Sequence, residues 1–117
     1  MEIVGLRNAQ GVVHLCLTHE PKGFPDCEGP GAVHATVRAS LSPVRYEFHS
    51  VPSGVYAVSA FHDANQDGTL NTTFGIPTEG FAFSRNPPMH MRAPHFDEAA
   101  FPSNGVQLAP IKMKYLL

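Results

Sequence analysis

The sequence predicts an all-β protein, a single antiparallel β-sandwich of about seven strands. Eleven prolines and ten glycines are scattered through 117 residues, which favours short strands joined by turns over long helices. Apolar and polar residues alternate in several short segments, as they do in half-buried strands. The length suits one domain over residues 1–117, so we expect an immunoglobulin-like or transthyretin-like (prealbumin-like) sandwich.

The expected strands follow this alternation along the chain. Residues 12–18 and 43–50 alternate most regularly, and residues 55–62 are apolar on both faces, as in a central strand. Weaker strands are expected at residues 4–6, 33–37, 81–83 and 111–117, a long polar loop at 63–80, and one or two helical turns at 94–101.

Composition excludes two classes of protein. The formal net charge is −2 and no basic cluster is present, which argues against a nucleic-acid-binding surface. No apolar run approaches the roughly 20 residues that a transmembrane helix needs. At 43% hydrophobic and 15% charged residues, the chain has an ordinary globular composition with enough apolar surface for one core.

The two cysteines give information on the cellular compartment in which the protein is expected. Cys16 and Cys27 flank a loop-like segment that a disulfide could close, which would stabilise the fold by about 3 kcal/mol. Cys16 also lies on the polar side of its expected strand, so we expect a disulfide and a periplasmic or secreted protein. No signal peptide is visible after Met1, and we expect a mature form with a new initiator methionine. The alternative is a cytosolic protein with two reduced, buried thiols.

The segment DANQDGTLN has the spacing of a calcium-binding loop. Calcium takes six to eight oxygen ligands, and alternate residues of a curling loop direct short oxygen-bearing side chains at one centre. The expected ligands are Asp63, Asn65 and Asp67 at loop positions 1, 3 and 5, the Thr69 carbonyl at position 7, and Asn71 at position 9, with Gly68 at the sharp turn.

This loop departs from an EF-hand at position 12, where Phe74 replaces the bidentate glutamate. Glu79 is the nearest carboxylate that could complete the site, and we expect a modest affinity suited to extracellular calcium. The alternative is a metal-free turn, because Asp, Asn and Gly also favour tight turns.

No motif of an esterase, metalloprotease or nucleotide-binding enzyme is present, and we expect a protein without catalytic activity. The alternative is a small hydrolase or ligand-processing enzyme in which His62, Asp63 and Glu79 act as acid–base groups. A third hypothesis is a copper-handling protein that uses Met89, His90, Met91 and His95 as soft and imidazole ligands.

The run from Gly54 to Ser84, together with PHFDEAAF, resembles the small exported bacterial proteins of domain-of-unknown-function family 2141. The matching positions are His62, Asp63, Asn65, Asp67, Gly68, Gly75, Ile76, Pro77, Glu79, Gly80, Phe83 and Ser84. The resemblance implies a β-sandwich and export with a signal peptide, and it implies no activity. It also joins the loop to the segment after it, so that Glu79 is expected to fold back over the loop, with Gly75, Pro77 and Gly80 shaping the return.

These observations predict a non-enzymatic binding or structural module that is stabilised by calcium. The rigid sandwich would present loops to a ligand of unknown identity, which could be a protein, a glycan or a small molecule.

Overall fold

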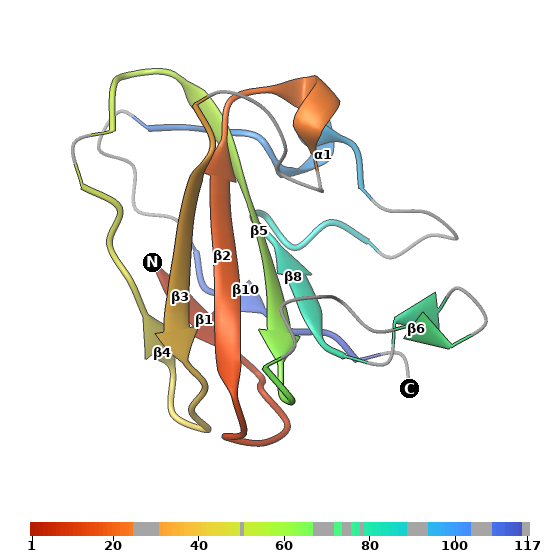
Figure 1. Ribbon diagram of the computed structural model, residues 1–117. Helices are drawn as coiled ribbons and strands as arrows, with labels where there is room; N and C mark the ends of the chain where they lie inside the picture. Colours follow the sequence, from red (N-terminus) through yellow and green to blue (C-terminus); the bar gives the residue numbers. More distant parts are fainter. Residues whose placement is uncertain are drawn as a thin grey trace.

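The computed structural model describes residues 1–24, 31–49, 51–66, 72–73, 76–77, 79–88, 94–103 and 109–115. Its strands form two facing sheets and one small hairpin (Figure 1). The larger sheet has the order β3 (Val33–Arg38), β2 (Val12–Thr18), β5 (Val55–Asp63), β8 (Phe81–Phe83), and β9 (Phe101–Pro102) also pairs with β5. The smaller sheet has the order β10 (Ile111–Lys112), β1 (Glu2–Val4), β4 (Val44–Arg45).

The hairpin and two helical segments complete the description. Strands β6 (Thr72–Thr73) and β7 (Ile76–Pro77) pair within the region expected to be loop. A short 3-10 helix, η1, spans Pro21–Gly23, and α1 spans Phe96–Ala99 as the sequence predicted. No helix in the described ranges is long and apolar enough to cross a membrane.

Strand β2 lies at the centre of the larger sheet, antiparallel to both β3 and β5. The predicted alternation is confirmed there: Val13 and Leu15 are at most 1% exposed and belong to the core. Residues of both sheets form that core, since Ile3 of β1 and Ile111 of β10 pack in the same cluster. The fold is therefore sandwich-like, as expected from the sequence.

The expectation of a wholly antiparallel arrangement is wrong at one place. Strands β1 and β10 pair in parallel, with Ile3 opposite Ile111. Both residues are at most 1% exposed, so the two chain ends pack side by side in the smaller sheet with their apolar side chains in the core. Alternation identifies which side chains point inward, but it carries no information on the direction of a neighbouring strand.

The expected strand at residues 43–50 is also much shorter in the structure. β4 covers only Val44 and Arg45, although Tyr46 and Phe48 still pack against the core. Its partner β1 has only three residues, and the ladder ends where the Tyr46 amide donates to the Met1 carbonyl at 3.1 Å. About seven strands were expected, and ten short ones are present among the described residues, because several pairings last only two residues.

Candidate metal loop at the end of the central strand

The last two residues of β5 point to opposite faces of the larger sheet. His62 pairs with Val13, a core residue, and Asp63 pairs with Val12 on the outer face. Successive side chains of a strand alternate between faces, so these two neighbours cannot meet in one site. His62 is 1% exposed and Asp63 is fully buried, and each is held by its own set of hydrogen bonds.

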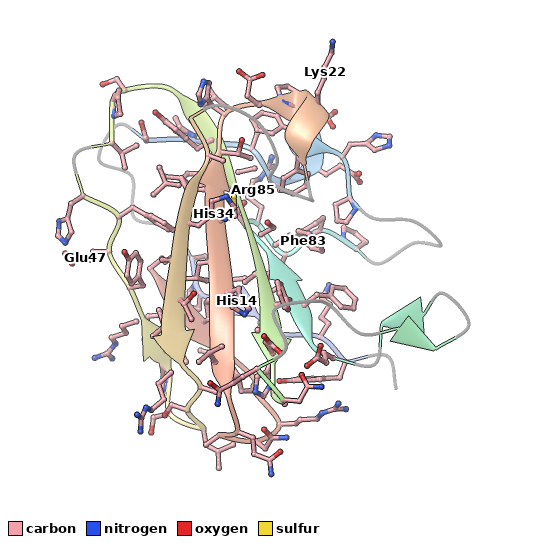
Figure 2. The ribbon with its side chains drawn as sticks, viewed as in Figure 1. His14, Lys22, His34, Glu47, Phe83 and Arg85 are labelled. Atoms are coloured by element: carbon pink, nitrogen blue, oxygen red, sulfur yellow. The ribbon has the colours of Figure 1, made fainter. Side chains whose placement is uncertain are left out.

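Asp63 is bound by a histidine of the neighbouring strand. His14 Nε2 lies 2.8 Å from Asp63 Oδ2, and His14 Nδ1 lies 3.2 Å from the hydroxyl oxygen of Thr36. His14 comes from β2, on the outer face of the larger sheet (Figure 2). Its ring also packs on Phe61, with centroids 4.7 Å apart. Since an ionised carboxylate only accepts hydrogen bonds, the Nε2 atom carries the proton in this pair.

The chain turns directly after Asp63. The Gln66 amide donates to the Asp63 carbonyl at 3.3 Å, and Gln66 has a φ of 57°, in the left-handed region. Gly11 lies against this turn, because a Cβ atom added there would collide with the backbone carbonyls of Asp63 and Ala64. Gly11 itself has a φ of 70°. The turn between β1 and β2 therefore supports the start of the candidate loop by close backbone approach.

Glu79 folds back over the start of the loop, as the sequence led us to expect. Its Oε2 atom accepts a hydrogen bond from the Ala64 amide at 3.0 Å, and Glu79 is 7% exposed. The neighbouring backbone fixes this return, since the His62 amide donates to the Gly80 carbonyl at 2.8 Å. A Cβ atom at Gly80 would meet the Tyr115 ring at 2.5 Å, so the missing side chain leaves room for that ring.

His62 anchors the opposite, inner face of the same strand end. Its Nε2 atom lies 2.7 Å from the Gln10 carbonyl oxygen and therefore donates, so a neutral ring would accept from the Tyr115 hydroxyl at 2.9 Å through Nδ1. The same hydroxyl oxygen accepts from the Arg7 amide at 3.1 Å, and the Arg7 guanidinium lies 4.4 Å from the ring centre. Burial raises the pKa of Tyr115, against smaller lowering effects of the Arg7 amide and the Arg7 charge.

The predicted ligands are only partly covered by the described residues. Asp63 and Glu79 are buried and Asn65 is exposed. Asp67, Thr69 and Asn71 lie outside the described residues, as do Gly68, Phe74 and Gly75. Within the described ranges, no cluster of three or more His, Cys, Asp or Glu side chains could hold a metal ion.

The donor chemistry nevertheless suits calcium, because two carboxylates and an amide oxygen are hard oxygen ligands. One oxygen of Asp63 is used by His14 and one of Glu79 by the Ala64 amide. An ionised carboxylate has about four lone-pair sites on its two oxygens, so a hydrogen bond to one oxygen does not by itself prevent the group from binding an ion. The calcium site stays a prediction.

The other predicted sites are placed as follows. Cys16 is 5% exposed on the outer face of β2, opposite Ser59 of β5, while Cys27 lies outside the described residues, so the disulfide stays a prediction. Met89, His90 and Met91 also lie outside them. His95 precedes α1, where its amide donates to the Glu98 carboxylate at 2.8 Å.

Sequence reasoning missed three residues that hold the loop base: His14, Gly11 and Tyr115. Each reaches the end of β5 from a distant part of the chain, and the pairing of strands that brings them there is not visible in local patterns. The signal that was available for His14 was its position on the polar side of a strand next to an apolar face.

The fold is that of a small sandwich-like β protein whose strand β5 ends in a buried aspartate, which an Asn/Asp-rich sequence follows. The chain belongs to the bacterial family described as uncharacterized protein conserved in bacteria (DUF2141), whose model matches residues 1–108. The resemblance noted in the sequence is thereby confirmed. Comparison with curated proteins and with solved structures found no match.

Proposed function

We propose that this protein is an exported, non-enzymatic binding or structural module whose loop at residues 63–71, closed by Glu79, binds calcium. In this proposal the sandwich has an immunoglobulin-like or transthyretin-like topology and acts in the periplasm or outside the cell. A disulfide between Cys16 and Cys27 would accompany export. The partner would be a protein, a glycan or a small ligand held by the loops.

One observation carries the calcium proposal: the Glu79 carboxylate is held over the loop that Asp63 begins. The 3.0 Å hydrogen bond from the Ala64 amide to Glu79 Oε2 places the Glu79 carboxylate against the backbone of the residue that follows Asp63. Asp63 and Glu79 are both almost fully buried, and a buried carboxylate is unfavourable unless other groups balance its charge. His14 supplies one partner for Asp63, and a divalent cation would supply a stronger one.

The ion would be held by the side chains of Asp63, Asn65, Asp67, Asn71 and Glu79 and by the Thr69 carbonyl. A calcium ion there would cross-link the end of β5 to the segment that leads into β8, and so stabilise the loop against opening. Because the bidentate glutamate of an EF-hand is absent, we expect a dissociation constant of roughly 0.1–1 mM, in the range of extracellular modules.

Calcium titration followed by amide NMR tests the proposal. We expect saturable shifts confined to residues 63–80 as calcium rises to about 10 mM, with much smaller shifts in an equal concentration of magnesium, which demands stricter octahedral geometry. Thermal unfolding should also shift upward with calcium, since a ligand that binds only the folded state stabilises it. No change at residues 63–80 in millimolar calcium would sink the metal site.

A hydrolase is the second candidate, and the chain of hydrogen bonds from Asp63 through His14 to Thr36 is the observation that favours it. A hydroxyl, an imidazole and a buried carboxylate in this order can activate the hydroxyl oxygen as a nucleophile. The earlier combination of His62, Asp63 and Glu79 is not supported, because His62 faces the core. Aryl-ester hydrolysis that is lost in Thr36→Val would support this candidate, and equal background rates in both proteins would contradict it.

A further inference from the structure

Strand β3 forms one edge of the larger sheet, and no strand in the described part of the chain pairs with its outer side (Figure 1). The other end of the sheet is closed, because Phe81 of β8 exchanges backbone hydrogen bonds with Lys114 at 3.0 and 2.9 Å. An open edge presents unpaired N–H and C=O groups that can template another strand. Among the described residues, the larger sheet is therefore protected on one side only.

One hydrogen bond identifies which backbone groups of β3 face outward, away from β2. The Ala39 amide donates to the Gly11 carbonyl at 3.1 Å, which makes residues 39 and 11 a hydrogen-bonded pair. Such pairs alternate along an antiparallel ladder, so every second residue bonds β2. Val33, Ala35 and Val37 therefore bond β2, whereas His34, Thr36 and Arg38 direct their N–H and C=O groups outward.

The side chains of β3 do little to block pairing. The strand contains no proline, glycine or acidic residue, and its only formal charge, Arg38, stands at its last position. Val33 is 46% exposed, although its partner Leu17 on β2 is only 4% exposed. An apolar side chain is thus left uncovered at the open edge, where natural proteins commonly place charge, proline or a bulge.

We propose that this edge is an interface between two copies of the chain, whose β3 strands pair antiparallel about a two-fold axis at Ala35. His34 of each copy then lies opposite Thr36 of the other, and each of these pairs exchanges both backbone hydrogen bonds. Val33 lies opposite Val37 of the other copy in the closer, non-hydrogen-bonded type of pair. The two larger sheets become one continuous sheet, with both cores on the same side.

Alternation and charge both favour this register. The outward-facing N–H and C=O groups of the two β3 strands can bond each other only if residues whose side chains lie on the same face of the sheet are opposite each other. A shift of the pairing by one residue would break this match and is therefore excluded. Placing Thr36 on the axis instead would set Arg38 opposite His34 of the other copy, and would leave Val33 opposite only the small Ala39. In the proposed register Arg38 lies opposite Ala32, and the net charge of −2 per chain gives little long-range repulsion.

An interface made by one strand from each copy is smaller than a standard protein interface, so we expect a weak dimer with a dissociation constant of roughly 10–1000 µM. The proposal does not depend on calcium, and the measurements are made with calcium and with a chelator. Sedimentation equilibrium over a range of protein concentrations should show a reversible monomer–dimer equilibrium under both conditions. A monomer throughout, up to about 1 mM, would overturn the proposal.

Val33→Lys tests the location of the interface, and Val55→Lys is its matched control. Val55 has a similar exposure of 53% but lies on β5, opposite Pro102 of β9. We expect Val33→Lys to raise the dissociation constant at least tenfold, because two lysines would enter the interface of each dimer, and Val55→Lys to leave it within about twofold. Equal effects of the two substitutions, or no effect of Val33→Lys, would show that the copies associate elsewhere.

A cross-link tests the register independently of affinity. Ala35→Cys would place two thiols opposite each other on the axis, at the Cα separation of about 4.5 Å found in non-hydrogen-bonded pairs, which a disulfide can span. We expect Ala35→Cys to form a covalent dimer in air and Val55→Cys to remain uncoupled under the same conditions. Equal cross-linking of the two variants, or none at Ala35→Cys, would overturn the two-fold pairing at Ala35.

Discussion

His14 of β2 and Asp63 of β5 form a 2.8 Å hydrogen bond that fixes the carboxylate at the start of the candidate loop. The Asp63 side chain is 1% exposed and that of His14 is 29% exposed, so the histidine lies between the buried acid and solvent. The bond joins β2 to β5, which already pair over the whole of β2, with His14 opposite Phe61. The sheet therefore contributes directly to the orientation of Asp63.

Replacing His14 should destabilise the protein. His14→Leu keeps an apolar group against Phe61 but leaves the Asp63 carboxylate without this hydrogen bond in a buried position. Losing one partner of a buried polar group costs about 1–3 kcal/mol. We expect that loss in the free energy of unfolding, measured by urea denaturation at pH 7.

Thr36→Val is the control for this prediction. It removes only the Thr36 hydroxyl, which bonds His14 on the side away from Asp63. Valine suits an exposed strand position, so we expect a change within about 0.5 kcal/mol. Equal losses of unfolding free energy in His14→Leu and Thr36→Val would mean that the hydrogen bond from His14 to Asp63 stabilises the fold no more than the one from His14 to Thr36.

Gly11→Ala should destabilise the same end of the larger sheet, because Gly11 packs against the backbone of Asp63 and Ala64. The added Cβ would collide with the carbonyls of Asp63 and Ala64, and alanine disfavours the φ of 70°. A left-handed conformation costs about 1–2 kcal/mol and overpacking typically adds 1–3 kcal/mol. We expect a total loss of about 2–5 kcal/mol in the free energy of unfolding.

Gly5→Ala separates these two effects. Gly5 has a similar φ of 82°, but a Cβ there would lie at an ordinary 3.4 Å from the Met113 carbonyl oxygen. It should lose only the conformational part, about 1–2 kcal/mol. If Gly5→Ala costs as much as Gly11→Ala, the contact with the loop base contributes nothing.

Local patterns predicted the parts of this fold that depend on local chemistry. Alternation located β2 and β5 to within a residue or two, because each buries one or both faces over many residues. The same pattern failed at residues 43–50: Val44, Tyr46 and Phe48 do pack in or against the core, but β4 ends at Arg45 because its partner strand is short. A strand needs a neighbour as well as a pattern, and the neighbour is not encoded locally.

The candidate site likewise has a part that the local sequence predicts and a part that it does not. The return of Glu79 over the loop was predictable, because the two segments are close in sequence and joined by turn residues. His14 was not, since it lies 49 positions before Asp63 and meets it only through strand pairing. The residues that supply oxygen ligands could be inferred from spacing, whereas the residues that orient them come from the tertiary structure.

Glu79→Gln separates a metal ligand from a backbone cap. A glutamine side-chain oxygen can still accept the hydrogen bond from the Ala64 amide, but it carries no charge for an ion. If Glu79 binds calcium, the calcium dissociation constant should rise at least about tenfold, measured by the NMR titration.

The stability of Glu79→Gln in chelator provides the internal control. We expect it to stay within about 1 kcal/mol of the unmodified protein, because the cap is kept. An unchanged calcium affinity together with unchanged stability would assign Glu79 to capping alone.

Tyr115 gives the protein a predictable response to alkaline pH. Its pKa is raised by burial above the usual value of 10.0, so the folded state holds the phenol proton more tightly than the unfolded state does. The stability that this contributes is fully present below about pH 10 and is lost as the pH rises through the folded pKa. The free energy of unfolding should therefore fall as the pH rises above about 10, as measured by urea denaturation.

Tyr115→Phe isolates this effect from the other groups that ionise at high pH. The variant keeps the ring beneath Arg7 but loses the hydroxyl that bonds His62 Nδ1 at 2.9 Å, so its stability at pH 8 should be lower by about 1–3 kcal/mol. Because it has no phenol at this position, the difference in stability between the two proteins should shrink as the pH rises above 10. The absorbance change of tyrosine ionisation should also lack one component that titrates above pH 10. A constant difference across this range would mean that the Tyr115 hydroxyl ionises equally in both states and that its burial has no energetic consequence.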